Sequence, residues 1–157
     1  MNNSNVKQNV KIGFDPNEDV LFLKNGNNIG LTVNEYGNIG IGMQGQSANL
    51  GYNLAVNGTI GAKEVVVENT SAWPDYVFKP EYPLTSLDEV KKHIDEKGHL
   101  PNIPSAQEVQ ENGISLGEMN RLLLEKVEEL TLYVIDIKEK NEAEIEALKA
   151  EIQNFKK

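Results

Sequence analysis

The feature that most constrains this chain is its C-terminal stretch of 40 residues, which contains neither glycine nor proline. A capping box, with Ser115 at the N-cap and Glu118 three residues later, precedes it and predicts a helix from there to about Phe155. Helices in globular proteins average about 11–12 residues. A helix this long needs a partner along its length.

Apolar residues in this segment follow a heptad pattern. Leu123, Val127, Leu130, Val134 and Ile137 are spaced by 4, 3, 4 and 3 residues, as a and d positions of a coiled coil are. The pattern then shifts phase, because 11 residues separate Val134 from the next apolar block; such a stutter relaxes the supercoil. The predicted seam comprises Leu123, Val127, Leu130, Val134, Ile137, Asn141, Ile145, Leu148, Ile152 and Phe155.

The identity of the seam residues does not by itself favour a trimer. Valine at a with leucine at d leans towards dimers, and a buried asparagine such as Asn141 is common in dimers too. Asn141 is interpreted as a register residue. The remaining surface is of mixed charge rather than basic, which favours self-association over membrane binding. The charged residues expected to be solvated are Glu125, Glu128, Glu129, Lys138, Glu142, Glu144 and Lys149.

The N-terminal part of the chain, residues 11–70, has the opposite composition. Ten of the 13 glycines lie at or before Gly61, and apolar residues alternate with small or polar ones, as in strands with one buried face. A four-residue unit at 28–31 recurs at 38–41, separated by a turn at 36–38. Further strands are predicted at 20–23, 54–56 and from 59 to 67. The predicted inward-facing residues are Ile29, Leu31, Val33, Ile39, Ile41 and Met43.

These strands carry too few large apolar side chains to form a hydrophobic core within one chain. Glycine weakens a strand unless another backbone must come close, and a small isolated sheet has little to bury. Several identical chains around one axis would solve this problem, since each would contribute one apolar row. Residues 1–10 are interpreted as a linker or disordered N-terminus.

The middle of the chain, residues 71–113, is predicted to be a compact collar. It holds five of the six prolines and an aromatic cluster, and capping boxes at Ser86 and Ser105 begin two short helices. The aromatic residues are expected to pack against the glycine-rich part. The alternative is a patch on which sugars stack. The cluster consists of Trp73, Tyr76, Phe78 and Tyr82.

From Leu54 onward, about two thirds of the chain resembles the C-terminal module of tail-fibre-like and cell-surface proteins of bacteria and phages, a group related to the intramolecular chaperone domains of tail spikes and endosialidases. The blocks that carry the resemblance are Asn57-Gly58-Thr59-Ile60, Ala62-Lys63-Glu64-Val65, Trp73-Pro74-Asp75-Tyr76-Val77-Phe78, Ser86-Leu87-Asp88-Glu89-Val90, His99-Leu100-Pro101, Ile103-Pro104-Ser105, Gly113-Ile114-Ser115-Leu116-Gly117-Glu118-Met119-Asn120 and Glu128-Glu129-Leu130-Thr131-Leu132-Tyr133.

The resemblance implies a parallel homotrimer in which a coiled coil aligns three interleaved β-chains. Self-cleaving members of the group use a serine and a lysine in a Ser-Asp-x-Arg-x-Lys-like motif near the junction with the shaft. Here the nearest serine, Ser71, is followed by no lysine until Lys79, so self-cleavage is not carried over. The module is expected to stay attached.

Other classes of function find little support. The chain has no cysteine, which removes disulfides, thiolate metal sites and cysteine nucleophiles. A net charge of −9 without a basic stretch argues against nucleic acid, and the chain shows neither a signal peptide nor a membrane-spanning run. His93 and His99 lack the spacing of a metal or catalytic motif. We therefore predict no enzymatic activity, cofactor or metal.

The sequence thus predicts an α+β fibrous homotrimer with a glycine-rich β shaft (11–70), a helical collar (71–113) and a C-terminal parallel coiled coil (114–157). Its predicted function is to direct trimerisation, register and folding of a tail-fibre-like protein, in a virion tail or an extracellular surface fibre. Its predicted partners are two further copies and tail or baseplate proteins at the N-terminal end. The alternative function is a tip that binds a host receptor or glycan.

Overall fold

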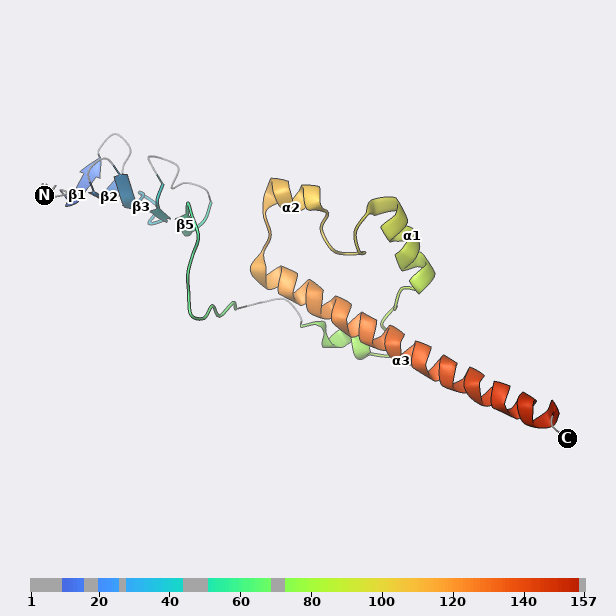
Figure 1. Ribbon diagram of the computed structural model, residues 1–157. Coiled ribbons are helices and arrows are strands. Elements are labelled where there is room, and N and C mark those ends of the chain that lie inside the picture. The colour runs from blue at the N-terminus through green and yellow to red at the C-terminus, as the bar shows by residue number, and fades with distance from the viewer. Residues whose placement is uncertain (1–9, 16–19, 26–27, 44–50, 69–72, 156–157) are drawn as a thin grey trace, which may run out of the picture. The chain divides into compact units, whose positions relative to one another are not determined.

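The protein is α+β and divides into two compact units, Met1–Val65 and Val66–Lys157 (Figure 1). The computed structural model describes residues 10–15, 20–25, 28–43, 51–68 and 73–155. The first unit holds a five-stranded sheet, and the second holds the helices. Most of the predicted N-terminal linker and Ser71 lie outside the described residues.

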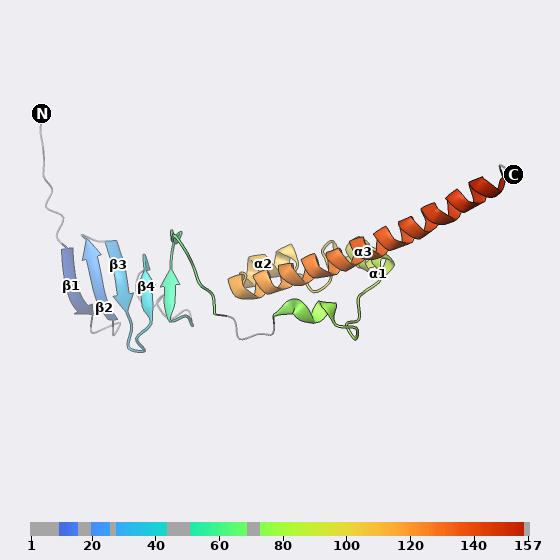
Figure 2. The same cartoon turned by 90° about the horizontal axis from the view of Figure 1, so that it is seen from below.

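The sheet has the strand order of the sequence (Figure 2). The first four strands form an antiparallel meander, and the fifth pairs with the fourth in parallel. The two copies of the four-residue repeat are neighbours, with Leu31 opposite Ile41. The strands are β1 (Val10–Asp15), β2 (Val20–Asn25), β3 (Asn28–Val33), β4 (Ile39–Ile41) and β5 (Leu54–Val56).

Local chemistry explains the turn between β3 and β4. The Asn34 side-chain oxygen accepts hydrogen bonds from the backbone N–H groups of Tyr36 and Asn38, and Gly37 adopts a φ of 78°. Side chains with a Cβ rarely adopt that conformation. The predicted turn at 36–38 is therefore confirmed.

One predicted strand is wrong, and one strand was not predicted individually. Residues 59–67 form no strand, because after Asn57 the chain leaves the sheet and pairs with no described strand. At the other edge, β1 pairs with β2 along its whole length, from Val10 opposite Asn25 to Asp15 opposite Val20. Val10, Ile12 and Phe14 alternate with Lys11, Gly13 and Asp15, so the period-two signal that predicted other strands was present here as well.

The second unit contains a 3-10 helix, η2 (Pro74–Phe78), and three α-helices, α1 (Leu87–Lys97), α2 (Ala106–Asn112) and α3 (Leu116–Phe155). Both predicted capping boxes of the collar are present, at Ser86 and Ser105. At the start of α3 the Glu118 carboxylate instead accepts two hydrogen bonds from Arg121. The 40-residue length of α3 agrees with the prediction.

Few apolar side chains are buried in the described parts of either unit. Among the described residues, the buried apolar side chains are those of Val20 and Ala55 in the sheet and of Pro74 and Val77 in η2. Most large apolar residues of the strands and of α3 are at least a third exposed. A folded domain normally hides most of its large aliphatic residues, so these surfaces are where the function has to be sought.

Candidate assembly surfaces

One face of the sheet is apolar across all five strands. Paired residues point to the same side, so Ile12, Leu23, Leu31, Ile41 and Val56 form a row from β1 to β5. A second row joins Phe14, Leu21, Val33, Ile39 and Leu54. Ile12 and Phe14 are 74% and 60% exposed. We call these two rows the sheet face.

The opposite side of the sheet combines the Phe22 ring with smaller or polar residues. Thr32 is fully buried, lies between Phe22 and Gly40 in the register, and donates its hydroxyl to the Gly40 carbonyl at 3.4 Å. A Cβ added at Gly13 would come within 2.7 Å of the Phe22 ring. Glycine therefore lets the aromatic ring lie flat on its neighbouring strand.

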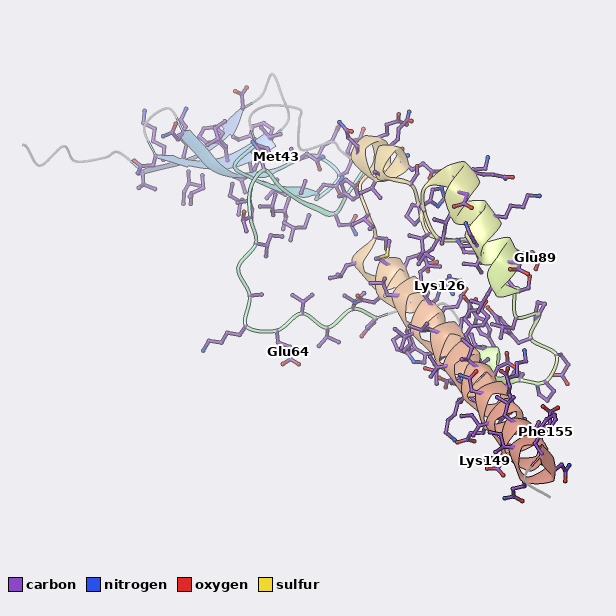
Figure 3. The ribbon with its side chains drawn as sticks, turned by 45° about the vertical axis from the view of Figure 1, so that its right-hand side comes forward. Met43, Glu64, Glu89, Lys126, Lys149 and Phe155 are labelled. Atoms are coloured by element: carbon purple, nitrogen blue, oxygen red, sulfur yellow. The ribbon has the colours of Figure 1, made fainter. Side chains whose placement is uncertain are left out.

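The predicted shaft residues lie together as expected, but they are only partly covered. Ile29, Leu31 and Val33 share one side of β3 and are half-buried. Ile39 and Ile41 are exposed, and Met43, just after β4, is half-buried (Figure 3). The sheet forms within one chain, so what remains available to other chains is the sheet face rather than unpaired strands inside it.

The predicted seam of α3 is exposed along the helix. Leu123, Val127 and Leu130 are 51%, 56% and 59% exposed, although this half of α3 packs against the collar. The values are similar in the other half, where Val134, Ile145 and Ile152 lie. At the C-terminal end Phe155 is almost fully exposed (Figure 3). The collar thus leaves the seam uncovered.

The buried side of α3 is its charged side, which corrects the sequence prediction. Glu125, Glu128 and Glu129 were expected to be solvated, yet they are 5%, 8% and 8% exposed. They lie on the side of the helix that packs against η2 and the segment after it. Lys138, Glu142, Glu144 and Lys149, beyond the collar, are exposed as predicted.

Tyrosines of the collar bind these carboxylates. Tyr76 donates its hydroxyl to Glu125 Oε2 at 2.5 Å, and Tyr82 donates to Glu129. Arg121 donates to Glu125 at 3.0 Å and to the Tyr76 hydroxyl at 2.9 Å, while Lys126 is 2.7 Å from Glu129. Tyr133 donates to the Thr85 carbonyl. The network joins collar and α3 by charge-assisted hydrogen bonds.

Two carboxylates in this contact have pKa values shifted in opposite directions. Burial alone would raise the pKa of Glu125, but the Tyr76 hydrogen bond and the charges of Lys126 and Arg121 outweigh burial and lower it. Burial raises the pKa of Glu128, and the charges of Asp75 and Glu125 raise it further. No group among the described residues hydrogen-bonds to the buried Glu128 Oε2.

The aromatic cluster divides into two pairs. Tyr76 and Tyr82 lie with their ring centroids 5.9 Å apart and reach α3, so their packing partner is the helix. Trp73 and Phe78 are each 54% exposed. The sequence did not reveal that the tyrosines pair with glutamates, although Glu125 and Glu129 recur at the i, i+4 spacing of one helical face.

A groove of about 500 Å³ lies between α1 and α3. Its walls are mostly apolar and combine residues of the collar with residues of the seam. Tyr133 and the aliphatic stem of Lys126 extend it on the α3 side. The remaining lining residues are Leu87, Val90, Leu100, Pro101, Leu123, Val127, Glu129 and Leu130.

The two histidines meet in the collar. The rings of His93 and His99 pack edge to face at 5.3 Å, and His99 Nδ1 lies 3.0 Å from the Leu100 carbonyl. Within the described residues, no group of three or more His, Asp or Glu side chains is arranged to hold a metal. None of the described helices combines the length and apolar character needed to cross a membrane.

Comparison with known proteins identifies no relative of this chain. No family model matches the chain, and no match was found among the curated proteins or the solved structures. The function is therefore inferred from the surfaces described above.

Proposed function

We propose that this chain is the assembly module of a trimeric, tail-fibre-like protein, in which three parallel copies of α3 pack along their seams. The observation that carries the proposal is the orientation of α3. Its charged side is occupied by its own collar, while its seam of ten heptad positions remains outward. The side of the helix that a coiled coil needs is the side left uncovered.

The collar contact favours this orientation. A helix folded alone against its own domain normally turns its apolar stripe inward. Here Tyr76 and Tyr82 satisfy the buried carboxylates, so the polar side is held inside by specific hydrogen bonds. The apolar side of the helix is thereby left exposed for packing against other chains.

The sheet face supports a shared core in the same assembly. Ten apolar side chains in two rows lie on one side of the sheet. Because the strands pair within one chain, three chains would pack sheet face against sheet face around a common axis. Three-fold rather than two-fold symmetry rests on the resemblance of the chain to trimeric fibre modules, since the seam residues alone also suit a dimer.

The coiled coil would also assist folding. Bringing three chains into parallel register places the sheets close together before their faces meet, which reduces the entropy lost on association. Contacts between distant segments form slowly when the chain must find them unaided. Such a module would belong to a phage tail or a cell-surface fibre, and its N-terminal end would connect to the rest of that fibre.

The solution mass tests this proposal, together with a matched pair of variants. Light scattering after size exclusion should give three times the 17.4 kDa of one chain. Val134→Asp should dissociate the assembly, because it places a charge in the seam. Ile135→Asp, the adjacent residue, should leave it intact, because Ile135 is similarly exposed but lies outside the seam.

The outcomes separate the parts of the proposal. A monomeric wild-type protein, or a trimer that tolerates Val134→Asp as well as Ile135→Asp, would overturn the coiled coil. A dimer would preserve the seam and reject the three-fold shaft.

The exposure of Trp73 and Phe78 favours a second candidate, a glycan-binding tip. Both aromatic rings remain more than half exposed beside the buried Pro74, and sugars stack on such surfaces. A glycan-array signal that Trp73→Ala removes while the solution mass stays unchanged would support it. Equal binding by wild type and variant would reject a role for this residue.

A further inference from the structure

The groove between α1 and α3 opens onto the seam. Of the α3 residues that line it, Leu123, Val127 and Leu130 are seam positions, and Lys126 and Tyr133 are the g positions beside them. The other wall comes from α1 and from the loop that contains Leu100 and Pro101. The groove therefore lies on the g side of the coiled-coil seam, and any helix packed against the seam on that side borders it.

The apolar side of α1 is not covered within the chain. Leu87, Val90 and Ile94 share one side of α1, and Leu87 and Ile94 are 47% and 42% exposed. The opposite side carries exposed ion pairs, Lys91 with Asp95 and Lys92 with Glu96. Figure 3 shows α1, marked by Glu89, running beside the half of α3 that contains Lys126. The packing of the collar on α3 is carried by η2 rather than by α1.

We propose that this groove receives α3 of the adjacent copy, so that α1 of one chain clasps the helix of its neighbour. The inference rests on the proposed coiled coil and adds a second contact to it. The occupant is a second copy because the seam residues that form the inner wall are those that the neighbouring helix would cover. A helix seated there would also cover Leu87, Val90 and Leu100 on the outer wall.

The geometry of a parallel coiled coil specifies which side of the neighbour enters. Residues at e of one helix face those at g of the next. In the register with Val127 at a, the e positions at this level are Leu124 and Thr131. The clasp therefore brings Val90 of one chain to Thr131 of the adjacent chain. Within one chain the two are on different sides of α3, since Thr131 is about 200° around the helix from Tyr133, which lines the groove.

Disulfide formation tests this contact directly, because the chain contains no natural cysteine. A full-length Val90→Cys/Thr131→Cys variant should form disulfide-bonded dimers and trimers under mild oxidation, visible on a non-reducing gel. Mixing the two single variants, unfolding and refolding them together should give the bonded dimer, which neither variant should form as efficiently alone.

The matched control moves the first cysteine to the other side of α1. Lys92→Cys/Thr131→Cys should yield at least about tenfold less bonded product, because a disulfide requires the two Cα atoms to lie within about 7 Å. Equal bonding by the two pairs would overturn the clasp.

Solution mass separates failure of the clasp from failure of the coiled coil. A wild-type trimer without bonding between positions 90 and 131 would reject the clasp and leave the proposed function standing. A monomeric protein would reject both.

Discussion

The sheet and the pair formed by α3 and the collar both expose an apolar surface, but they differ in what lies behind that surface. Both turn a continuous apolar surface outward, the sheet face in one unit and the seam in the other. Behind the seam lies a network of Tyr76, Arg121, Glu125 and Glu129 that holds the helix to its own collar. Behind the sheet face lie the half-buried Phe22 ring and the buried side chains of Val20, Thr32 and Ala55.

This difference indicates which part folds without partners. Hydrogen bonds that involve charged groups contribute about 1.5–3 kcal/mol each, and several join α3 to the collar. In the described part of the sheet the buried side chains are those of Val20, Thr32 and Ala55, and small isolated sheets are marginal in water. We therefore expect the collar and the first half of α3 to form in one chain, whereas the sheet depends on assembly.

The largest expected effect comes from deleting residues 134–157. Among the described residues, the hydrogen bonds between the collar and α3 reach no further along the helix than Tyr133, so this cut leaves them intact. A cut at 123 would remove Glu125 and Glu129 as well. The truncated chain should become monomeric or aggregate, and the β signal in circular dichroism should fall while helical signal from the collar persists. A soluble trimer with an unchanged β signal would contradict the expectation that the sheet depends on assembly through α3.

A smaller effect is expected from Glu125→Gln. At pH 7 this variant weakens charge-assisted hydrogen bonds from Tyr76 and Arg121 and should destabilise the collar by about 2 kcal/mol. Because folding lowers the pKa of Glu125, its stabilisation is present above the ordinary carboxyl pKa and is lost as the pH falls through the lowered value. Thermal unfolding followed by Trp73 fluorescence should show wild type and variant converging in acid; a constant difference would contradict this role.

The smallest effect, with opposite sign, is expected from Glu128→Gln. The pKa of Glu128 is raised in the folded protein, so its charged form opposes folding as the pH rises through that value. Removing the charge should stabilise the collar by about 1 kcal/mol at pH 7, because no group in the described part of the chain hydrogen-bonds to the buried Glu128 Oε2. The same fluorescence measurement should show the gain disappearing at low pH. A destabilised variant at pH 7 would show that Glu128 has a partner in the assembled protein.

Local signals predicted most of the elements. The capping boxes at Ser86 and Ser105 placed the starts of α1 and α2. A short apolar run placed β2, and period-two alternation placed β3 and β4. The predicted strand through Val65, Val66 and Val67 failed, because β-branched residues favour extended backbone but only a neighbouring strand makes a sheet.

The candidate surfaces were predicted in part. The seam of α3 was found from its spacing, since a heptad pattern is a property of sequence alone. The contact behind it was not, because Glu125, Glu128 and Glu129 have the composition of a solvated helix face. Only the position of Tyr76 and Tyr82, more than 40 residues earlier, makes their burial possible.

The sequence by itself determined the α+β composition, the 40-residue helix and the periodicities of its apolar residues, because these depend on neighbours along the chain. The tertiary structure decided which side of α3 the collar covers, which strands pair, and how α1 forms a groove beside the seam. These features depend on contacts between distant residues. The hydrogen bonds from two tyrosines to two glutamates turn the polar side of α3 inward and leave its apolar side outward.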